Sequence, residues 1–258
     1  MSLEKESKIN KLLKAWPKGT VYLSRWLGAN GYSSQLLNRY KNSNWIENVG
    51  VGAVKRFGDD ISIEGALYAL QKQAESTIHI GGKSALSLQG KAHYLQFSAT
   101  KIQLFGGKNE KLPSWLIHYP WKAELQYFSS SFLPEDIGLV PKEIKNFSIY
   151  ISGPARAMME CLYLAPKKED LIECYELIEG LNNLRPTVVQ QLLENCTSIK
   201  VKRLFLYMAE KAALQWFDYL DISKIDLGKG KRSLAKNGVY VPKYKISLPE
   251  KLTNYGIL

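Results

Sequence analysis

Residues 20–57 constrain the fold of this chain more than any other segment, because they carry the full pattern of a winged helix–turn–helix. Leu23, Trp26 and Leu27 have the i, i+3, i+4 spacing of one buried helical stripe. The tetrapeptide Gly-Ala-Asn-Gly at 28–31 predicts the end of that helix, since glycine and asparagine tolerate the positive φ of a sharp exit. The pattern therefore predicts the first helix and the turn of the motif.

A second helix is predicted to begin after Ser33, whose hydroxyl suits an N-cap. Tyr32 before the cap and Leu37 after it are placed as a hydrophobic staple. Helical spacing predicts that Leu36, Leu37 and Tyr40 point inward. The side chains left facing outward are polar and of types that bind base edges in a major groove: Ser34, Gln35, Asn38, Arg39 and Asn42.

Two short apolar segments, Trp45–Val49 and Ala53–Phe57, follow this helix and predict a β-ribbon. The tripeptide Gly-Val-Gly at 50–52 between them suits a hairpin turn. Lys55 and Arg56 stand near the far end of the second segment, where we expect a wing to meet phosphates. The competing interpretation is a helical hairpin followed by an unrelated turn, because such helical patterns also arise by chance.

The candidate DNA-contacting residues follow from these positions. Gln35, Asn38 and Arg39 are expected to read base edges. The other candidates are the capping serine and four residues expected to hold phosphates: Ser33, Ser34, Lys41, Lys55 and Arg56. Double-stranded DNA is therefore the first predicted partner.

The net charge of +11 is concentrated at the two ends of the chain. Residues 1–58 hold 10 Lys or Arg against 3 Asp or Glu, and residues 196–258 hold 12 against 5, so each segment has a net charge of +7. Residues 59–195 hold 13 against 16, a net charge of −3. Clustered positive charge favours a polyanionic partner through counterion release, although a solvated basic surface has the same composition.

With 258 residues, 45% of them hydrophobic, the chain is long enough for two domains with separate cores. Residues 1–92 are predicted to form the winged domain with trailing helices. Residues 93–258 are predicted to form an α+β domain with a small sheet and a C-terminal helical cluster. The junction falls between 75 and 95. The predicted strands of the sheet are His93–Phe97, Lys101–Phe105, Leu125–Ser129 and Phe147–Ile151.

Helical periodicity accounts for most of the remaining sequence. Helices are predicted from Lys5 to Ala15 and from Ile63 to Ala74 in the first half. In the second half, helical spacing recurs from Pro154 onward, and Pro186 suits the first turn of one helix. The basic, glycine-rich tail from Ile225 to Tyr244 is compatible with either a strand or a loop.

The sequence lacks the residue spacings of metal, cofactor and catalytic sites. His79, His93 and His118 are scattered, and the three cysteines form no CxxC pair. The segment 228–233 resembles a phosphate-binding loop, but Ile225 stands where that motif requires glycine. We therefore expect no metal, no cofactor and no enzymatic activity, and we expect the cysteines to be small buried hydrophobes.

The sequence also lacks the signals of membrane insertion and secretion. No apolar run approaches the ~20 residues that a membrane-spanning helix needs. The lysine-rich start has no apolar core of a signal peptide. We therefore expect a cytoplasmic protein that does not bind membranes.

Several different short motifs follow one another between about residue 15 and about residue 250. They are Trp26-Leu27, Leu36-Leu37-x-x-Tyr40, Trp45-Ile46-Glu47-x-x-Gly50-x-Gly52-Ala53, His79-x-Gly81-Gly82, Ser152-x-Pro154-x-Arg156-Ala157 with Glu160, Leu184-Arg185-Pro186, Lys200–Leu206 and Leu227-Gly228-x-Gly230-Lys231-Arg232. Each motif is weak alone. Their order and spacing together resemble the AbiEi-type antitoxins of bacterial type IV abortive-infection toxin–antitoxin systems.

The resemblance implies a protein with two roles. The winged domain would repress its own operon by binding repeats at the promoter, and the second domain would counteract a toxin of the nucleotidyltransferase class. Neutralisation in type IV systems need not require a stable complex with the toxin. One alternative is a plain winged-helix transcription factor whose second domain senses a ligand or dimerises. Another is a nucleic-acid enzyme, which the sparse histidines and scattered carboxylates disfavour.

Within this interpretation, the second basic segment is the expected place of the antitoxin surface. Its candidate residues are Lys200, Lys202, Arg203, Lys231 and Arg232. The sequence leaves four alternatives open for them: the toxin, the nucleotide or RNA substrate of the toxin, another nucleic acid, or solvent alone.

Overall fold

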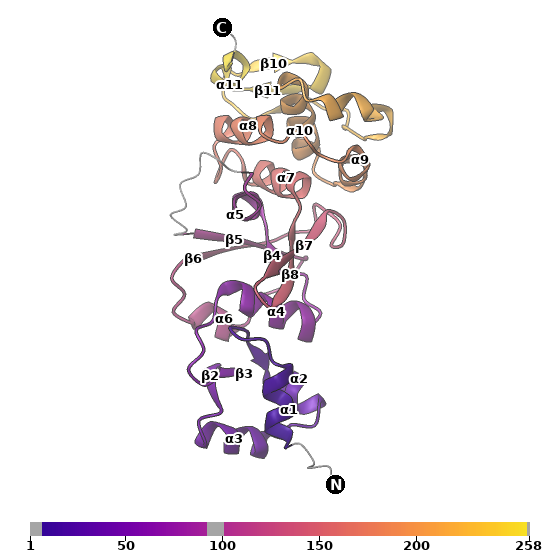
Figure 1. Cartoon of the computed structure of the whole chain (residues 1–258). Coiled ribbons are helices and arrows are strands. Elements are labelled where there is room, and N and C mark those ends of the chain that lie inside the picture. Colours follow the sequence, from indigo (N-terminus) through magenta and orange to yellow (C-terminus); the bar gives the residue numbers. More distant parts are fainter. Residues whose placement is uncertain (1–6, 92–100, 257–258) are drawn as a thin grey trace.

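The structure is a computed structural model that describes residues 7–91 and 101–256, and it is elongated (Figure 1). A winged domain lies at one end, a five-stranded sheet in the middle and a helical cluster at the other end. The predicted α+β class is confirmed. The predicted strand His93–Phe97 lies outside the described residues.

The winged domain has the order helix, strand, helix, helix, strand, strand, which is the predicted winged helix–turn–helix. Its elements are α1 (Lys8–Ala15), β1 (Tyr22–Leu23), α2 (Ser24–Ala29), α3 (Ser34–Asn42), β2 (Ile46–Gly50) and β3 (Ala53–Arg56). The strands are antiparallel in the order β1-β3-β2. Helix α1 begins at Lys8, where the Ser7 side chain caps it by accepting from the Asn10 N–H, and the predicted start at Lys5 lies outside the described residues.

A small separate core holds the winged domain together. Every helix and strand of the domain contributes to it: Leu12, Trp16, Tyr22, Leu27, Leu37, Tyr40, Ile46 and Val54. The rings of Trp16 and Tyr22 pack with centroids 4.2 Å apart, and the Trp16 indole donates to the Thr20 carbonyl at 3.2 Å. Burying a large apolar side chain stabilises a fold by about 1.5–3 kcal/mol, so this cluster fixes α3 on its support.

Helix α4 (Ile63–Gln73) joins the winged domain to the rest of the molecule. Gly65 lies so close to the preceding loop that a Cβ atom there would be 1.9 Å from the Gly19 carbonyl oxygen. The Val21 N–H donates to the Gly65 carbonyl at 3.2 Å. The buried face of α4 belongs to the larger core of the protein, so α4 touches both parts.

The central sheet has the strand order β6-β5-β4-β8-β7. The strands are β4 (His79–Ile80), β5 (Lys101–Gly106), β6 (Glu124–Ser129), β7 (Leu139–Ile144) and β8 (Phe147–Ser152). The predicted strands Lys101–Phe105, Leu125–Ser129 and Phe147–Ile151 are confirmed as β5, β6 and β8. The sequence pattern does not predict β7, because Pro141 and the charged residues after it hide the strand; an edge strand tolerates such a proline.

Helices cover both faces of this sheet (Figure 1). Helices α5 and α7 pack together on one face, and α4 packs on β8 at the other. The helices after α4 are α5 (Gly82–Leu88), α6 (Ser114–His118), α7 (Pro154–Leu164), α8 (Leu171–Glu179), α9 (Pro186–Asn195), α10 (Ile199–Lys211) and α11 (Glu250–Asn254). The basic tail forms a second small sheet, β10-β11-β9, from Val239–Val241, Ile246–Leu248 and Arg232–Ser233.

The chain has two clusters of buried apolar residues, and the division into two domains at 92/93 stays a prediction. The buried residues of the small core all lie between Leu12 and Val54, whereas α4, β4 and α5 belong to the larger core. Strand β4 pairs with β5 and β8, which follow it in the chain. A boundary at 92/93 therefore runs through the central sheet.

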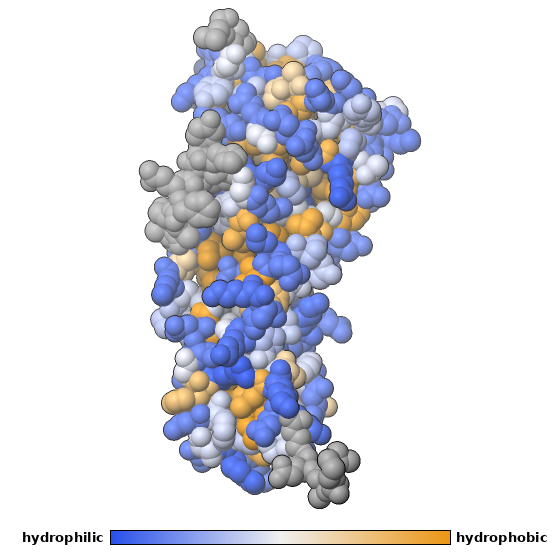
Figure 2. Space-filling view, viewed as in Figure 1, coloured by the Kyte–Doolittle hydropathy of each residue, from blue (hydrophilic) through white to orange (hydrophobic). Residues whose placement is uncertain are grey.

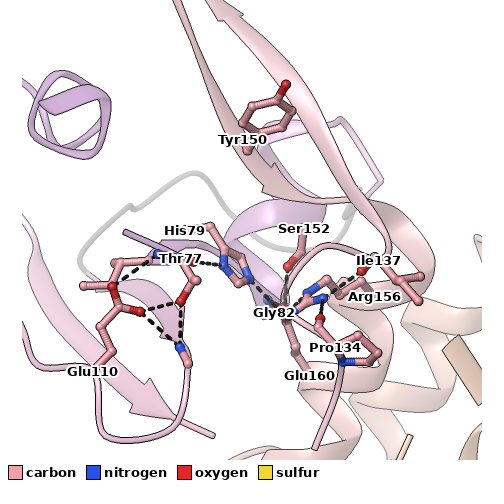
Figure 3. A network of polar contacts seen from close by, with 12 residues as sticks. Thr77, His79, Gly82, Glu110, Pro134, Ile137, Tyr150, Ser152, Arg156 and Glu160 are labelled. Carbon is pink, nitrogen blue, oxygen red and sulfur yellow. Dashed lines mark hydrogen bonds and ion pairs between the residues drawn. The ribbon is translucent and has the colours of Figure 1, made fainter. Parts of the chain in front are cut away.

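A buried carboxylate, that of Glu160 on α7, ties four elements together (Figure 3). It accepts from the His79 Nε2 at 3.2 Å, the Gly82 N–H at 2.9 Å and the Arg156 Nε at 3.0 Å. The Ser152 hydroxyl donates to the same carboxylate at 2.7 Å. The contacts come from β4, α5, α7 and β8, so one side chain joins the segment before 92 to the segment after 101.

The hydrogen-bond acceptors in this network indicate which atoms carry protons. The His79 Nδ1 lies 2.7 Å from the Thr77 carbonyl, which only accepts, so this nitrogen carries a proton. Burial raises the pKa of Glu160, but the hydrogen bond and charge of His79, the charge of Arg156 and the Gly82 N–H together hold that pKa below its ordinary value. Glu160 is therefore ionised at neutral pH.

We predict that Glu160→Gln lowers the free energy of unfolding by about 3–5 kcal/mol, because it leaves the buried guanidinium of Arg156 without its counter-charge. Since the Glu160 pKa is lowered by folding, its stabilisation is complete above the ordinary pKa of 4.5 and is lost as the pH falls below that value. Urea denaturation between pH 3.5 and pH 7 measures both effects. Glu143→Gln, on an exposed residue of β7, is the control. An equal effect of the two substitutions contradicts the prediction.

Candidate nucleic-acid interface

The outer face of α3 presents the predicted polar side chains to solvent. Gln35, Asn38 and Arg39 are exposed, and their spacing places them on one side of the helix. Leu37 and Tyr40 on the opposite side are 4% and 7% exposed. The lower tip of the molecule, where α3 lies, is mainly hydrophilic (Figures 1 and 2). The predicted division into inner and outer faces is therefore correct.

The start of α3 is held in a fixed position. The Ser33 side chain accepts from the Leu36 N–H at 3.3 Å, as predicted for an N-cap. The turn before it requires Gly31, whose φ is +85°. Helix α1 holds this turn from behind, because the Lys8 Nζ donates to the Gly31 carbonyl at 3.1 Å and the Tyr32 hydroxyl donates to the Lys8 carbonyl at 3.3 Å.

The ribbon after α3 has an exposed tip. Val51 is 89% exposed, and Gly52 turns the chain with a φ of +82°. The Ser24 N–H donates to the Gly52 carbonyl at 2.8 Å, which fixes the tip beside the start of α2. The tip is thus tied to the start of α2.

Lys55 and Arg56 lie at the base of this ribbon, and their charged groups are engaged within the protein. Lys55 Nζ lies 3.1 Å from the Glu47 carboxylate and donates to the Asp59 carbonyl at 2.6 Å. Arg56 donates to the carbonyl of Leu13 on α1. Contact of Lys55 and Arg56 with phosphates stays a prediction, and in this structure both side chains have partners within the protein.

Other cations of the winged domain are more exposed than Lys55 and Arg56. Lys11, Lys18 and Arg25 are exposed, although the sequence analysis does not single them out. The sequence feature that points to them is the net charge of +7 of residues 1–58. The four predicted cations supply only part of that charge: Arg39, Lys41, Lys55 and Arg56. Lys41 itself is half-buried in the last turn of α3.

The predicted basic surface of α10 is largely interior. Lys202 is 3% exposed and Arg203 is 1% exposed. Lys200 donates to the carbonyls of Tyr163 and Ala165, and burial together with nearby Arg232 lowers its pKa to about 8. The prediction that these three residues form an open basic surface is wrong, because α10 is a core helix that buries Lys202 and Arg203 and leaves Lys200 half-buried.

Arg203 has a structural role that the sequence does not reveal. Its guanidinium donates to the carbonyls of Leu227 at 2.8 Å, Lys245 at 2.8 Å and Gly228 at 3.1 Å. These acceptors lie on either side of β9, so Arg203 pins the small C-terminal sheet onto α10.

Lys231 and Arg232 are exposed, as predicted, and two further lysines extend them. We call the set Lys229, Lys231, Arg232 and Lys236 the C-terminal basic face. The Lys231 Nζ lies 5.0 Å from the centre of the Tyr240 ring, whose side chain is also exposed. This face, rather than α10, carries the exposed positive charge of the tail.

The described ranges 7–91 and 101–256 contain no group of His, Cys, Asp and Glu side chains arranged to hold a metal ion. Cys161, Cys174 and Cys196 are buried and unbonded, which confirms their predicted place in the core. Burial raises the pKa of Cys174 to about 12 and that of Cys196 to about 11, so neither is a reactive thiolate. No helix in those ranges is long and apolar enough to cross a bilayer.

We predict that Arg203→Met lowers the free energy of unfolding by about 3 kcal/mol, because three backbone carbonyls lose a charged donor that is itself buried. Arg232→Met, on the exposed basic face, is the matched control and is expected to stay within about 0.5 kcal/mol of the parent. Guanidinium denaturation of both variants provides the comparison. Unchanged stability of Arg203→Met would restore the surface role expected from the sequence.

Comparison with known proteins is consistent with this architecture. A solved structure, that of the Rv2827c protein from Mycobacterium tuberculosis, superposes with a TM-score of 0.58 over 95% of this chain and 90% of that chain. The two sequences are 12% identical, so the likeness concerns the fold alone. No curated protein matches the sequence.

Family models match nearly the whole chain. A model described as transcriptional regulator, AbiEi antitoxin, type IV toxin–antitoxin system matches residues 99–249. A model of the N-terminal domain of AbiEi antitoxin transcriptional regulators matches residues 5–97. The chain therefore belongs to the AbiEi family of antitoxins and transcriptional regulators of type IV toxin–antitoxin systems.

Proposed function

We propose that this protein represses its own operon by inserting α3 into the major groove of promoter repeats, and that it also counteracts a nucleotidyltransferase-type toxin. The observation that carries the first part is the exposed polar face of α3 on a rigid apolar support. Family membership supports the second part. Both partners are expected to meet the protein in the cytoplasm.

Gln35, Asn38 and Arg39 have the chemistry needed to distinguish bases. Gln and Asn bind the N6 and N7 edge of adenine in a bidentate manner, and Arg binds the O6 and N7 edge of guanine. Because the three side chains share one exposed face, they can address neighbouring base pairs of the same groove.

Phosphate contacts come from around this face. Ser33 and Ser34 lie at the N-terminal end of α3, where free backbone N–H groups favour anions. Lys11, Lys18 and Arg25 add exposed positive charge within the same domain. Lys55 and Arg56 also help to fix the ribbon, since their charged groups have partners within the protein.

We predict that Gln35→Ala or Arg39→Ala weakens binding to the promoter repeats by about 1–3 kcal/mol and relaxes the base preference at one position. Glu143→Gln, on an exposed residue of β7 in the central sheet, is the control, and it should change neither the affinity nor its salt dependence appreciably. Fluorescence anisotropy with the protein's own promoter and with scrambled DNA measures all three variants. Equal affinity of the parent protein for both DNAs contradicts base reading.

We assign the antitoxin role to the second half of the chain, with the C-terminal basic face as its contact surface. The exposed charge of Lys231 and Arg232, next to the exposed ring of Tyr240, suits an acidic surface or a phosphate-bearing molecule. Arg203 and Lys200 support that face from beneath.

We predict that the double variant Lys231→Glu/Arg232→Glu fails to restore growth of cells that express the cognate toxin, because its contact surface has reversed charge. The double variant Gln35→Ala/Arg39→Ala should still restore growth while losing repression. Growth assays with the full-length chain, together with a promoter–reporter assay, separate the two roles. Failure of the parent protein to rescue growth would favour a plain transcription factor.

A further inference from the structure

The three-stranded sheet of the winged domain has two edges, and the second half of the molecule holds one of them. The edge strands are β1 and β2, with β3 between them. Helix α4 binds the edge at β1, and helix α6 packs on β2. Helix α6 comes from the long connection between β5 and β6, about sixty residues further along the chain.

At the β1 edge, the side chain of Gln73 substitutes for a missing strand. Its Oε1 accepts from the Leu23 N–H at 2.7 Å, and its Nε2 donates to the Val21 carbonyl at 3.1 Å. Both backbone groups of this edge thereby gain partners from the end of α4. The β1 side of the sheet is thus fixed to the helix that enters the larger core.

At the β2 edge, Gly50 lies directly against Trp115 of α6. A Cβ atom built on Gly50 would lie 2.8 Å from the Trp115 Cβ and 3.1 Å from the Trp115 Cα. Real Cβ atoms essentially never come that close, so the contact requires glycine. The pairing of β2 with β3 is irregular between Asn48 and Gly50, which places this contact next to the wing tip.

Trp115 cannot easily withdraw from this contact. It is 5% exposed, and Leu116 beside it is fully buried. The Trp121 indole donates to the Leu116 carbonyl at 2.6 Å and closes the end of α6. Tyr119 packs on Trp121 with ring centroids 4.5 Å apart. The backbone opposite Gly50 is therefore held by the core of the second half.

We propose that Trp115 is a positioning residue for DNA binding: through Gly50 it sets where the wing tip lies relative to α3. This inference rests on the proposed function of α3. The tip, with Val51 exposed, follows Gly50 immediately, so a shift of β2 away from α6 moves the tip and its contact with the phosphates beside the groove. Residues 1–58 alone do not contain this contact.

The test is Gly50→Ala in the full-length chain. The added methyl group forces β2 away from α6, and we expect a loss of about tenfold in affinity for the promoter repeats, which corresponds to about 1.4 kcal/mol. Gly28→Ala is the matched control, because a Cβ atom at Gly28 meets nothing within 4 Å. Phosphate-ethylation interference supplies the second readout: contacts at the flanking phosphates should disappear, while those around the bases read by α3 persist.

A core variant with a similar loss of stability distinguishes a general loss of stability from a specific displacement of the wing tip. Ile149→Val removes one methyl group from a residue of β8 that is 1% exposed and belongs to the central sheet rather than to the sheet of β2, and it leaves the wing intact. Equal losses of affinity in Ile149→Val and Gly50→Ala would overturn the proposal. So would a folded Gly50→Ala protein with the affinity and phosphate pattern of the parent.

A second variant covers the case in which Gly50→Ala does not fold. Trp115→Leu keeps an apolar side chain but loosens α6, and we expect it to lose the same flanking phosphate contacts. Parental contacts in Trp115→Leu would overturn the proposal. If the parent protein binds its promoter repeats no better than other DNA, the proposed function is contradicted. That result comes from the parent protein alone, so it is distinguishable from a result that contradicts the role of Trp115.

Discussion

The buried carboxylate of Glu160 is the interaction on which the architecture depends. An ionised group in an apolar interior is costly unless charges and donors surround it, and here His79, Arg156, Ser152 and a backbone N–H do so. Gly81 leaves the space, since a Cβ atom there would lie 2.3 Å from the carboxylate. His79 and the backbone N–H precede residues 92–100 in the sequence, whereas Ser152, Arg156 and Glu160 follow them. The network therefore joins the two segments into one folded unit.

A rigid body suits a protein that presents a short helix to a large ligand. Helix α3 has nine residues and little stability of its own, so its geometry depends on the small core beneath it. That core is linked to the rest through α4 and, at the other edge of the sheet, through α6. The same molecule then carries positive charge at its far end, on a sheet that Arg203 fastens to α10.

Local patterns allowed much of this to be predicted. The cap at Ser33, the turn at Gly31 and the apolar stripe of α3 are properties of neighbouring residues, and sequence spacing shows them directly. The surface role of Lys202 and Arg203 was wrong because charge does not reveal burial: α10 is covered on nearly all sides by segments distant in sequence. The engagement of Lys55 by Glu47 and Asp59 depends on strand register, and the Gly50–Trp115 contact joins residues 65 positions apart, so neither has a local signal.

The position of β4 inside the central sheet has a consequence for exchanging parts between related proteins. A chimera cut at residue 92 would take the middle strand and His79 from one parent and their neighbours from the other. A chimera joined at the turn near Gly58 takes the whole small core from one parent and leaves the central sheet intact. Such a graft keeps its contact with α6 only when the donated segment also carries glycine at the position of Gly50, because any larger residue there would meet Trp115.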